Sequence, residues 1–328
     1  MFDLRSIRST NIWIPISKSW HRFHLFMYFR FLNRGFKNNY KRNKNCRPYK
    51  IEKPNLDSLR LSEEIYKYFK KTDLLKVIKE KMIKTNDRTS YTEDIYNHLS
   101  MSIKSSIFDF AISDIKIQNF IKKYFGFRAR LHSIRILYNI PKKNSILEGP
   151  KLWHRDTTDS DLRQIKIFIP ITNINNQNGP LYLLRNENLA KEHLAILGTK
   201  DQYNDTRVRD KSIKKLNGNI FSSEGITKGY KIYFDSKRVY HKGGFAKSKD
   251  RLMLQLQFMG SAFSGDKPQD FYEEIKFLVN NKINYKSNKF LQSYLFEHKR
   301  FLNFNPFEKF VRYLFFRLGI IFTHYIKT

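Results

Sequence analysis

The sequence has little cysteine and no long apolar run, and these absences exclude several classes of protein. Cys46 is the only cysteine in 328 residues, so no disulfide can form within the chain and no multi-cysteine zinc site can be built. A bound metal would have to use His, Asp or Glu. A membrane-spanning helix needs about 18 or more apolar residues. The nearest candidate, Tyr313 to Phe322, is broken by Arg317, so no spanning helix is expected.

The N-terminus also lacks the features of a secretory signal. Its apolar stretch NIWIPIS is short, and no small-residue cleavage site follows it. We therefore expect a cytoplasmic protein.

Acidic residues are few relative to basic ones. There are 62 Lys and Arg against 30 Asp and Glu, a formal net charge of +32. Such an excess usually indicates a nucleic acid, an anionic membrane or an acidic protein as partner. Lys, Asn, Ile, Phe and Tyr are, however, abundant in every part of the chain, as a genome-wide compositional bias would produce. Both interpretations stay open, and nucleic acid is not the favoured partner.

The 41% of hydrophobic residues is enough for a real core, and their spacing divides the chain. Residues 1–50 form a basic, aromatic arm without a clear period. Residues 51–265 form the main domain, in which a helical block (57–126) precedes a sheet core (127–260). The last helix of the block is predicted to begin at a cap, Ser113, and to stop at Gly126. Residues 266–328 form a C-terminal helical extension.

The sheet core is indicated by a period of two in four segments, 131–140, 164–174, 229–235 and 251–259. Long polar connections separate them, which favours an antiparallel sheet or barrel over alternating strands and helices. The fold class is therefore mainly β with flanking helices, an α+β arrangement. The final helix, starting at Asn305, is apolar nearly all round, which suits either docking on the core or peripheral contact with a membrane.

Strand parity assigns two faces to the predicted sheet. In RLMLQLQFM (251–259) the four apolar residues Leu252, Leu254, Leu256 and Phe258 share one face and should pack against the helices. Arg251 shares the opposite face, which should look into a cavity. In QIKIFIPIT the isoleucines share one face, and Lys166 lies on the other, as a candidate cavity residue.

Candidate metal ligands stand at the ends of two predicted strands. In LWHRDTT (152–158), His154 and Asp156 are two residues apart, so an extended backbone directs both to one side. A second imidazole, His241, follows the strand GYKIYFD and precedes two glycines. Two imidazoles and one carboxylate are the facial ligand set of non-haem iron oxygenases. Arg251 is predicted to enter the same cavity. Its planar guanidinium group would bind a carboxylate there through two hydrogen bonds.

The segments WHRD, IKIFIPITNINNQNGPLYLL, KGYKIYFDSKRVYHKGG and DRLMLQLQF resemble the phytanoyl-CoA dioxygenase family of iron(II)/2-oxoglutarate oxygenases over roughly residues 130–260. The resemblance implies a double-stranded β-helix, or jelly roll, of the cupin kind. It implies that His154, Asp156 and His241 are the catalytic iron ligands and that Arg251 pairs with the distal carboxylate of 2-oxoglutarate. Family relatives that halogenate lack the carboxylate ligand, so the presence of Asp156 implies hydroxylation.

The expected activity is therefore that of a dioxygenase that uses Fe(II), 2-oxoglutarate and dioxygen to hydroxylate a small-molecule or acyl/lipid-like substrate. The cosubstrate contacts predicted are Arg251 and Lys166. Two alternatives stay open: an oxygenase acting on RNA or protein, and a non-catalytic jelly-roll binding module. The remaining histidines are predicted to be structural or solvated, and Trp153 is predicted to pack. The sequence predicts neither the substrate nor the oligomeric state.

Overall fold

A computed structural model describes residues 46–84, 92–125, 130–141, 151–156, 164–185, 219–236, 239–259 and 269–281, together with residues 202–203, 207–208, 210 and 213. Most of the predicted N-terminal arm and the predicted helix that starts at Asn305 lie outside these residues.

The described residues form five α-helices and two antiparallel sheets. The helices are α2 (Leu56–Lys71), α3 (Leu74–Lys84), α4 (Met101–Ser113), α5 (Ile115–Phe125) and α8 (Tyr272–Asn280), with a short 3-10 helix, η3 (Tyr96–His98). The first sheet has the order β1 (Tyr49–Glu52), β10 (Lys231–Asp235), β5 (Gln164–Pro170), β12 (Arg251–Met259), β3 (Arg130–Asn139) and β2 (Thr92–Asp94). The second has the order β7 (Gln202–Tyr203), β8 (Arg207–Val208), β4 (Trp153–His154), β11 (His241–Gly243), β6 (Leu181–Arg185) and β9 (Asn219–Ser222).

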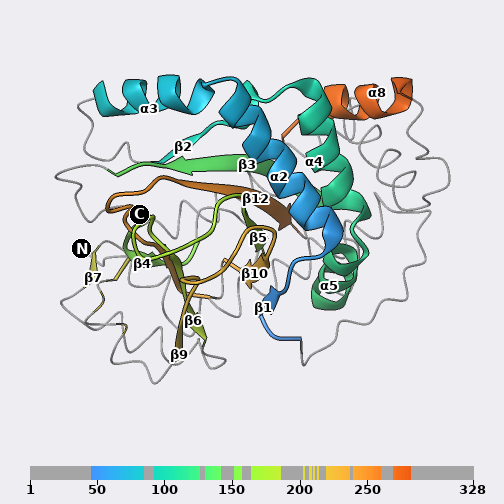
Figure 1. Ribbon diagram of the computed structural model, residues 1–328. Coiled ribbons are helices and arrows are strands. Elements are labelled where there is room, and N and C mark those ends of the chain that lie inside the picture. The colour runs from blue at the N-terminus through green and yellow to red at the C-terminus, as the bar shows by residue number, and fades with distance from the viewer. Residues whose placement is uncertain are drawn as a thin grey trace, which may run out of the picture.

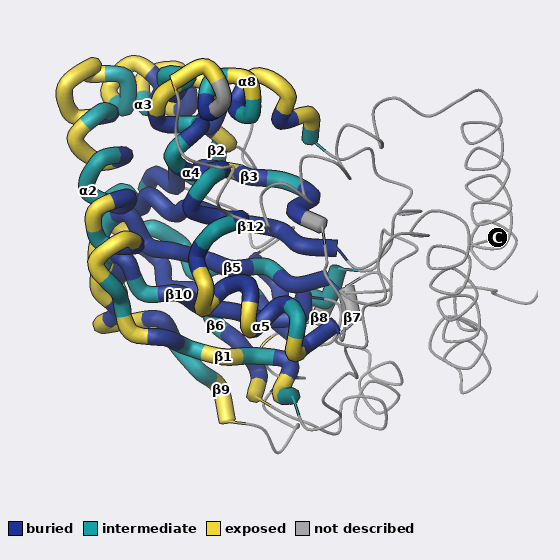
Figure 2. The backbone as a smooth tube through the Cα atoms, turned by 90° about the vertical axis from the view of Figure 1, so that its right-hand side faces the viewer, coloured by how far each residue is buried: buried dark blue, intermediate teal, exposed yellow. Residues whose placement is uncertain are grey.

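The helices cover one face of the first sheet, and Figure 1 shows α2, α4 and α5 along that side. Leu252, Leu254, Leu256 and Phe258 of β12 are buried in one cluster with apolar residues from these helices. The isoleucines of β5 belong to the same cluster. The predicted parity of both strands is therefore confirmed. In Figure 2 the central strands are buried, whereas exposed residues lie on the outer turns of α2 and α3.

The other face of the first sheet packs against the second sheet. A second apolar cluster joins Phe168, Phe234 and Met253 from the first sheet to Leu181 and Leu183 from β6. Because strand neighbours alternate between faces, Arg251 and Lys166 lie on this same inner face. The polar residues predicted to enter a cavity thus stand between the two sheets.

A buried ion cluster fixes the helices on the sheet. Nζ of Lys231, which is fully buried in β10, lies 2.6 Å from Oδ2 of Asp114 and 3.6 Å from Oε1 of Glu52. Asp114 also caps α5, because its Oδ1 accepts the backbone N–H of Ile117 at 2.8 Å. The N-cap residue of α2, Asn55, donates to the same carboxylate at 3.3 Å. One carboxylate therefore connects two helix starts to the sheet.

The predicted helix boundary at Ser113 is wrong. Ser113 is the last residue of α4, and α5 is capped by Asp114 instead. A carboxylate accepts the free N–H groups at a helix start as well as a serine hydroxyl does, and here it also pairs with a buried lysine. The predicted stop, Gly126, lies outside the described residues, but α5 does end at Phe125.

The strand predictions held best for long strands. The segment predicted at 164–174 ends at Pro170, because a proline has no N–H to donate to the ladder. β1 and β2 were not predicted: β1 crosses the expected boundary at residue 50, and β2 lies within the expected helical block. From the expected C-terminal extension, α8 packs beside α4, and Phe271 and Leu278 join the helix-side core.

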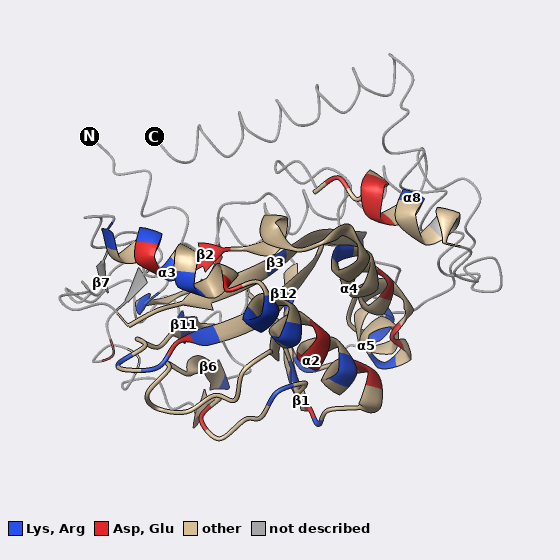
Figure 3. Cartoon of the chain, turned by 45° about the horizontal axis from the view of Figure 1, so that its top comes forward, with Lys and Arg blue, Asp and Glu red and all other residues tan. Residues whose placement is uncertain are grey.

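Two features of the structure relate to the partners that the sequence suggested, an anionic partner and a membrane: the distribution of charged residues and the length of the helices. Figure 3 shows Lys and Arg spread over several elements and interspersed with Asp and Glu, as along α2. Within the ranges that the structure describes, no helix combines the length and apolar character needed to cross a membrane.

Candidate metal centre

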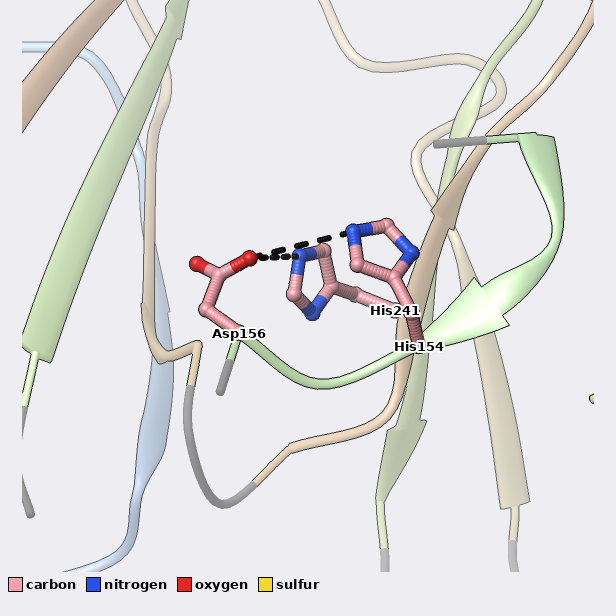
Figure 4. Close-up of side chains that lie close together, drawn as sticks. All are labelled: His154, Asp156 and His241. Atoms are coloured by element: carbon pink, nitrogen blue, oxygen red, sulfur yellow. Dashed lines mark ion pairs between the residues drawn. The ribbon is translucent and has the colours of Figure 1, made fainter. Parts of the chain in front are cut away.

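The two imidazoles are brought together by strand pairing. His154 on β4 and His241 on β11 are direct partners in the antiparallel ladder, and their ring centroids are 4.3 Å apart. Asp156 follows two residues after His154, and its backbone N–H donates to the carbonyl of Ser236 at 2.8 Å. One potential ligand atom from each of the three side chains lies within 4.8 Å of the others. Figure 4 shows the three groups converging from two segments of the chain.

Backbone carbonyls fix the tautomer of both imidazoles. Nδ1 of His154 is 2.8 Å from the carbonyl oxygen of Leu152, and Nδ1 of His241 is 3.0 Å from that of Val239. A carbonyl oxygen only accepts, so each Nδ1 carries the hydrogen and each Nε2 keeps its lone pair. An acceptor of this kind behind a metal-binding imidazole orients the ring and raises its basicity.

The carboxylate of Asp156 uses its two oxygens differently. Oδ1 lies 3.8 Å from Nε2 of His154 and 3.9 Å from Nε2 of His241. Oδ2 lies 2.7 Å from Nζ of Lys166 and accepts from Nε2 of Gln164 at 3.4 Å. Burial opposes ionisation of this carboxyl and is the largest single effect, but Lys166, His241 and His154 together outweigh it and hold the pKa well below its usual range. The group is an anion at neutral pH.

Burial keeps the second imidazole neutral. His241 is 5% exposed, and the ring of Phe234 packs on it with centroids 4.9 Å apart. Burial, helped by neighbouring His154, lowers the pKa of His241 to about 3. A neutral imidazole is the form that binds a metal.

The two residues predicted to contact the cosubstrate occupy different places. Lys166 does enter the space between the sheets, but it pairs with Asp156. Arg251 lies on the same face of the sheet, six residues along β12 from Gln257, the ladder partner of Lys166. The structure therefore joins Lys166 to the triad and places Arg251 further along the inner face.

Arg251 is buried and only partly satisfied. It is 6% exposed, and its Nη2 donates to Oδ1 of Asn139 at 3.1 Å. Asn139 is in turn held by Thr92 on β2. Among the residues that the structure describes, Nε and Nη1 of Arg251 have no hydrogen-bond partner. These two N–H groups belong to a buried cation on the inner face of the sheet. A carboxylate ligand would satisfy both of them.

Trp153 and the other described histidines lie apart from the metal centre. Trp153 packs with Leu184, Ile213 and Tyr240 in a third apolar cluster, so its predicted packing role is confirmed. His98 is exposed and His132 is buried in β3. His21, His24, His193, His298 and His324 lie outside the described residues.

Sequence reasoning missed Lys151. It precedes β4, is 3% exposed, and donates from Nζ to the carbonyl of Gly244 at 2.6 Å. Strand parity is no guide here, because Lys151 stands ahead of the strand and three residues before His154. The available signal was a lysine within an apolar segment beside a candidate ligand.

Comparison with known proteins gives remote similarities only. No family model matches the chain. No curated protein sequence matches it either. Among solved structures, the non-heme alpha ketoglutarate dependent epimerase SnoN from nogalamycin biosynthesis is similar with a TM-score of 0.44 and 13% identity, over 68% of this chain and 82% of that one.

Two further structures are similar at the same level. EctD from S. alaskensis with 2-oxoglutarate and 5-hydroxyectoine has a TM-score of 0.42 and 14% identity, over 70% of this chain and 80% of that one. A Pseudomonas putida prolyl-4-hydroxylase has a TM-score of 0.37 and 12% identity, over 65% and 92%. TM-scores and sequence identities this low do not assign a function, so a function for this chain has to be argued from its own side chains.

Proposed function

We propose that the chain is an iron(II)- and 2-oxoglutarate-dependent dioxygenase of the phytanoyl-CoA dioxygenase-like kind, which hydroxylates a small-molecule or acyl/lipid-like substrate. The observation that carries the proposal is the orientation of three donors: two Nε2 lone pairs and one carboxylate oxygen point to a common position. The two facing antiparallel sheets support a double-stranded β-helix core for this enzyme.

The donor set fits iron(II). Two imidazole nitrogens and one carboxylate oxygen on one side of a metal, with further positions open, are typical of non-haem iron oxygenases. His154, Asp156 and His241 would hold the ion. Once bound, iron(II) with 2-oxoglutarate and dioxygen supplies oxidative decarboxylation to succinate and carbon dioxide, with one oxygen atom entering succinate and the other entering a C–H bond of the substrate.

The buried guanidinium fits the cosubstrate. 2-Oxoglutarate has a metal-binding 2-oxo acid at one end and a second carboxylate at the other. On the inner face, Arg251 offers two donors that have no partner among the described residues, which suits the second carboxylate. Between the sheets, Phe168 and Met253 supply apolar surface for the methylene groups that join the two ends.

The remaining roles belong to side chains that hold the site in shape. Lys166 helps to keep Asp156 ionised and holds Oδ2, which leaves Oδ1 directed at the imidazoles. The carbonyls of Leu152 and Val239 keep both rings in the ligating tautomer. These groups preorganise the centre, so little reorganisation is needed when ligands bind.

The proposal is tested by succinate formation. Purified protein would be loaded anaerobically with Fe(II), given 2-oxoglutarate and air, and screened with small molecules, acyl-CoA thioesters, peptides and RNA oligonucleotides. We expect a small molecule or acyl thioester to increase succinate formation and to yield a hydroxylated product, with none from His154→Ala. Stimulation by RNA or peptide alone would contradict the substrate class. Failure to bind or consume 2-oxoglutarate would contradict the enzyme and favour a binding module.

A further inference from the structure

Two of the three proposed ligands are held by one short connection of the chain, which joins β10 to β11. The carbonyl of Ser236 accepts the backbone N–H of Asp156 at 2.8 Å. The carbonyl of Val239 lies 3.0 Å from Nδ1 of His241 and accepts its hydrogen. Ser236 and Val239 are both fully buried. Because Asp156 and His241 come from separate segments, a shift of this connection would move two ligands at once.

Hydrogen bonds close the connection and tie it to the first sheet. The N–H of Val239 donates to the carbonyl of Asp235, the last residue of β10, at 2.8 Å. The N–H of Ser236 donates to the carbonyl of Gln164, the first residue of β5, at 2.9 Å. The N–H of Asp235 donates to the carbonyl of Pro48 at 2.7 Å. Asp235 therefore stands where the sheet passes into the connection.

The side chain of Asp235 joins this point to the helix layer. Asp235 is fully buried, and its Oδ2 accepts the hydroxyl of Tyr124 at 2.5 Å. Tyr124 is 1% exposed near the end of α5, and its ring packs on Phe120 and Phe125 with centroids 5.9 and 5.5 Å apart. Packing of α5 thus fixes the position of the hydroxyl. A hydrogen bond to a carboxylate is among the stronger ones in proteins.

We propose that Tyr124 and Asp235 are positioning residues of the metal centre. The hydrogen bond between them holds the β10–β11 connection in place, and through it sets where Asp156 and His241 direct their ligand atoms. This inference rests on the proposed function. The imidazole of His154 is oriented by a different carbonyl, that of Leu152, and serves as an internal reference.

A second buried tyrosine provides a matched control. The hydroxyl of Tyr96 donates to Oε1 of Glu274 at 2.8 Å, and the two residues are 3% and 5% exposed. This bond joins η3 to α8 rather than to the β10–β11 connection. Tyr96→Phe and Tyr124→Phe each remove a buried hydroxyl from a carboxylate, so both should lower stability. Only Tyr124→Phe should change the metal centre.

Anaerobic titration with Co(II), followed by visible absorption, measures affinity and the arrangement of the ligands. Tyr124→Phe should weaken Co(II) binding about three- to tenfold, less than the roughly 10- to 100-fold typical of a residue that contacts a ligand directly, and should shift the absorption bands. Tyr96→Phe should change neither. Asp235→Asn, whose amide oxygen can still accept from Tyr124, should retain more affinity than Asp235→Ala.

Proton NMR of the Co(II)-loaded protein separates the two imidazoles. Each ligating histidine contributes one strongly shifted, exchangeable signal from its Nδ1 hydrogen. The signal of His241 is identified by its proximity to the ring of Phe234, whose centroid is 4.9 Å from that of the imidazole. In Tyr124→Phe this signal should move and exchange faster with water, whereas the signal of His154 should change less. A general loss of stability would not select one histidine.

The outcomes separate this inference from the proposed function. The positioning role is wrong if Tyr124→Phe and Tyr96→Phe have the same affinity and spectrum, or if both imidazole signals change equally. It is also wrong if Asp235→Asn and Asp235→Ala lose equal affinity, a comparison that still decides should Tyr124→Phe fail to fold. In each case the metal centre stands. If the wild type does not bind Co(II) through two histidines, the proposed function itself is wrong.

Discussion

Nζ of Lys166 lies 2.7 Å from Oδ2 of Asp156, while Oδ1 of the same carboxylate faces Nε2 of both histidines at 3.8 and 3.9 Å. One oxygen is thus held by a protein cation, and the other is directed at the metal position. A lysine in this place limits Asp156 to a single ligating oxygen, which leaves more positions of the metal open to cosubstrate and dioxygen.

Replacing this lysine should weaken the metal site without destroying it. In Lys166→Met, Asp156 loses its ion pair, and we expect metal affinity to fall about 10- to 100-fold, as is typical when a partner of a ligand is removed. Lys166→Arg should keep most of the affinity. Anaerobic titration with Co(II), followed by its visible absorption, measures both. Unchanged affinity in the methionine variant would show that Lys166 does not orient the ligand.

The buried side chain of Lys151 should reduce stability. Because burial lowers the pKa of Lys151 to about 6 from 10.5, the unfolded chain binds more protons than the folded chain between these pH values, and stability rises with pH across that window. Lys151→Met should raise the free energy of unfolding at pH 7. It should also reduce the slope of stability with pH by up to about 1.4 kcal/mol per pH unit.

Urea unfolding of both proteins at pH 6.5 and 8.5 measures this difference. The same slope in the two proteins would show that Lys151 is charged in the folded state.

The buried ion cluster should be a large contributor to folding. Lys231→Met leaves the carboxylate of Asp114 buried without its cation, whereas Glu52 keeps Lys50 and Lys116, and breaking a buried pair in this way costs about 3–5 kcal/mol. Adding Asp114→Leu should recover part of that loss. Lys228→Met, which breaks an exposed pair of similar length, should cost no more than about 1 kcal/mol. Chemical denaturation compares the three, and equal losses from the two lysines would contradict the role of the buried cluster.

Strand parity predicted much of the architecture. The alternation in β12 and β5 correctly assigned Leu254 and Ile167 to the helix side and Lys166 to the inner face, because a period of two fixes the face of each residue. The triad followed from spacing and resemblance. His154 ends β4 and His241 begins β11, and each lies in sequence near a longer segment with a clear period of two.

Other features depend on contacts that the sequence does not show. Strands of two to five residues, such as β4 and β6, are too short to show a period, so the second sheet was not predicted. The pairing of Lys166 with Asp156 joins residues that only the sheet register brings together. The cap of α5 was placed at Ser113 because the buried partner of Asp114 lies over a hundred residues away in β10.

Metal binding by three side chains is the claim on which the account depends, and anaerobic equilibrium titration with Fe(II) tests it most directly. The wild type should bind one iron per chain, and His154→Ala, Asp156→Ala and His241→Ala should each lose most of that affinity. The control is His98→Ala, at an exposed histidine outside the centre, and should bind iron as the wild type does. A wild type that binds no iron, or three ligand variants that still bind it tightly, would contradict the account.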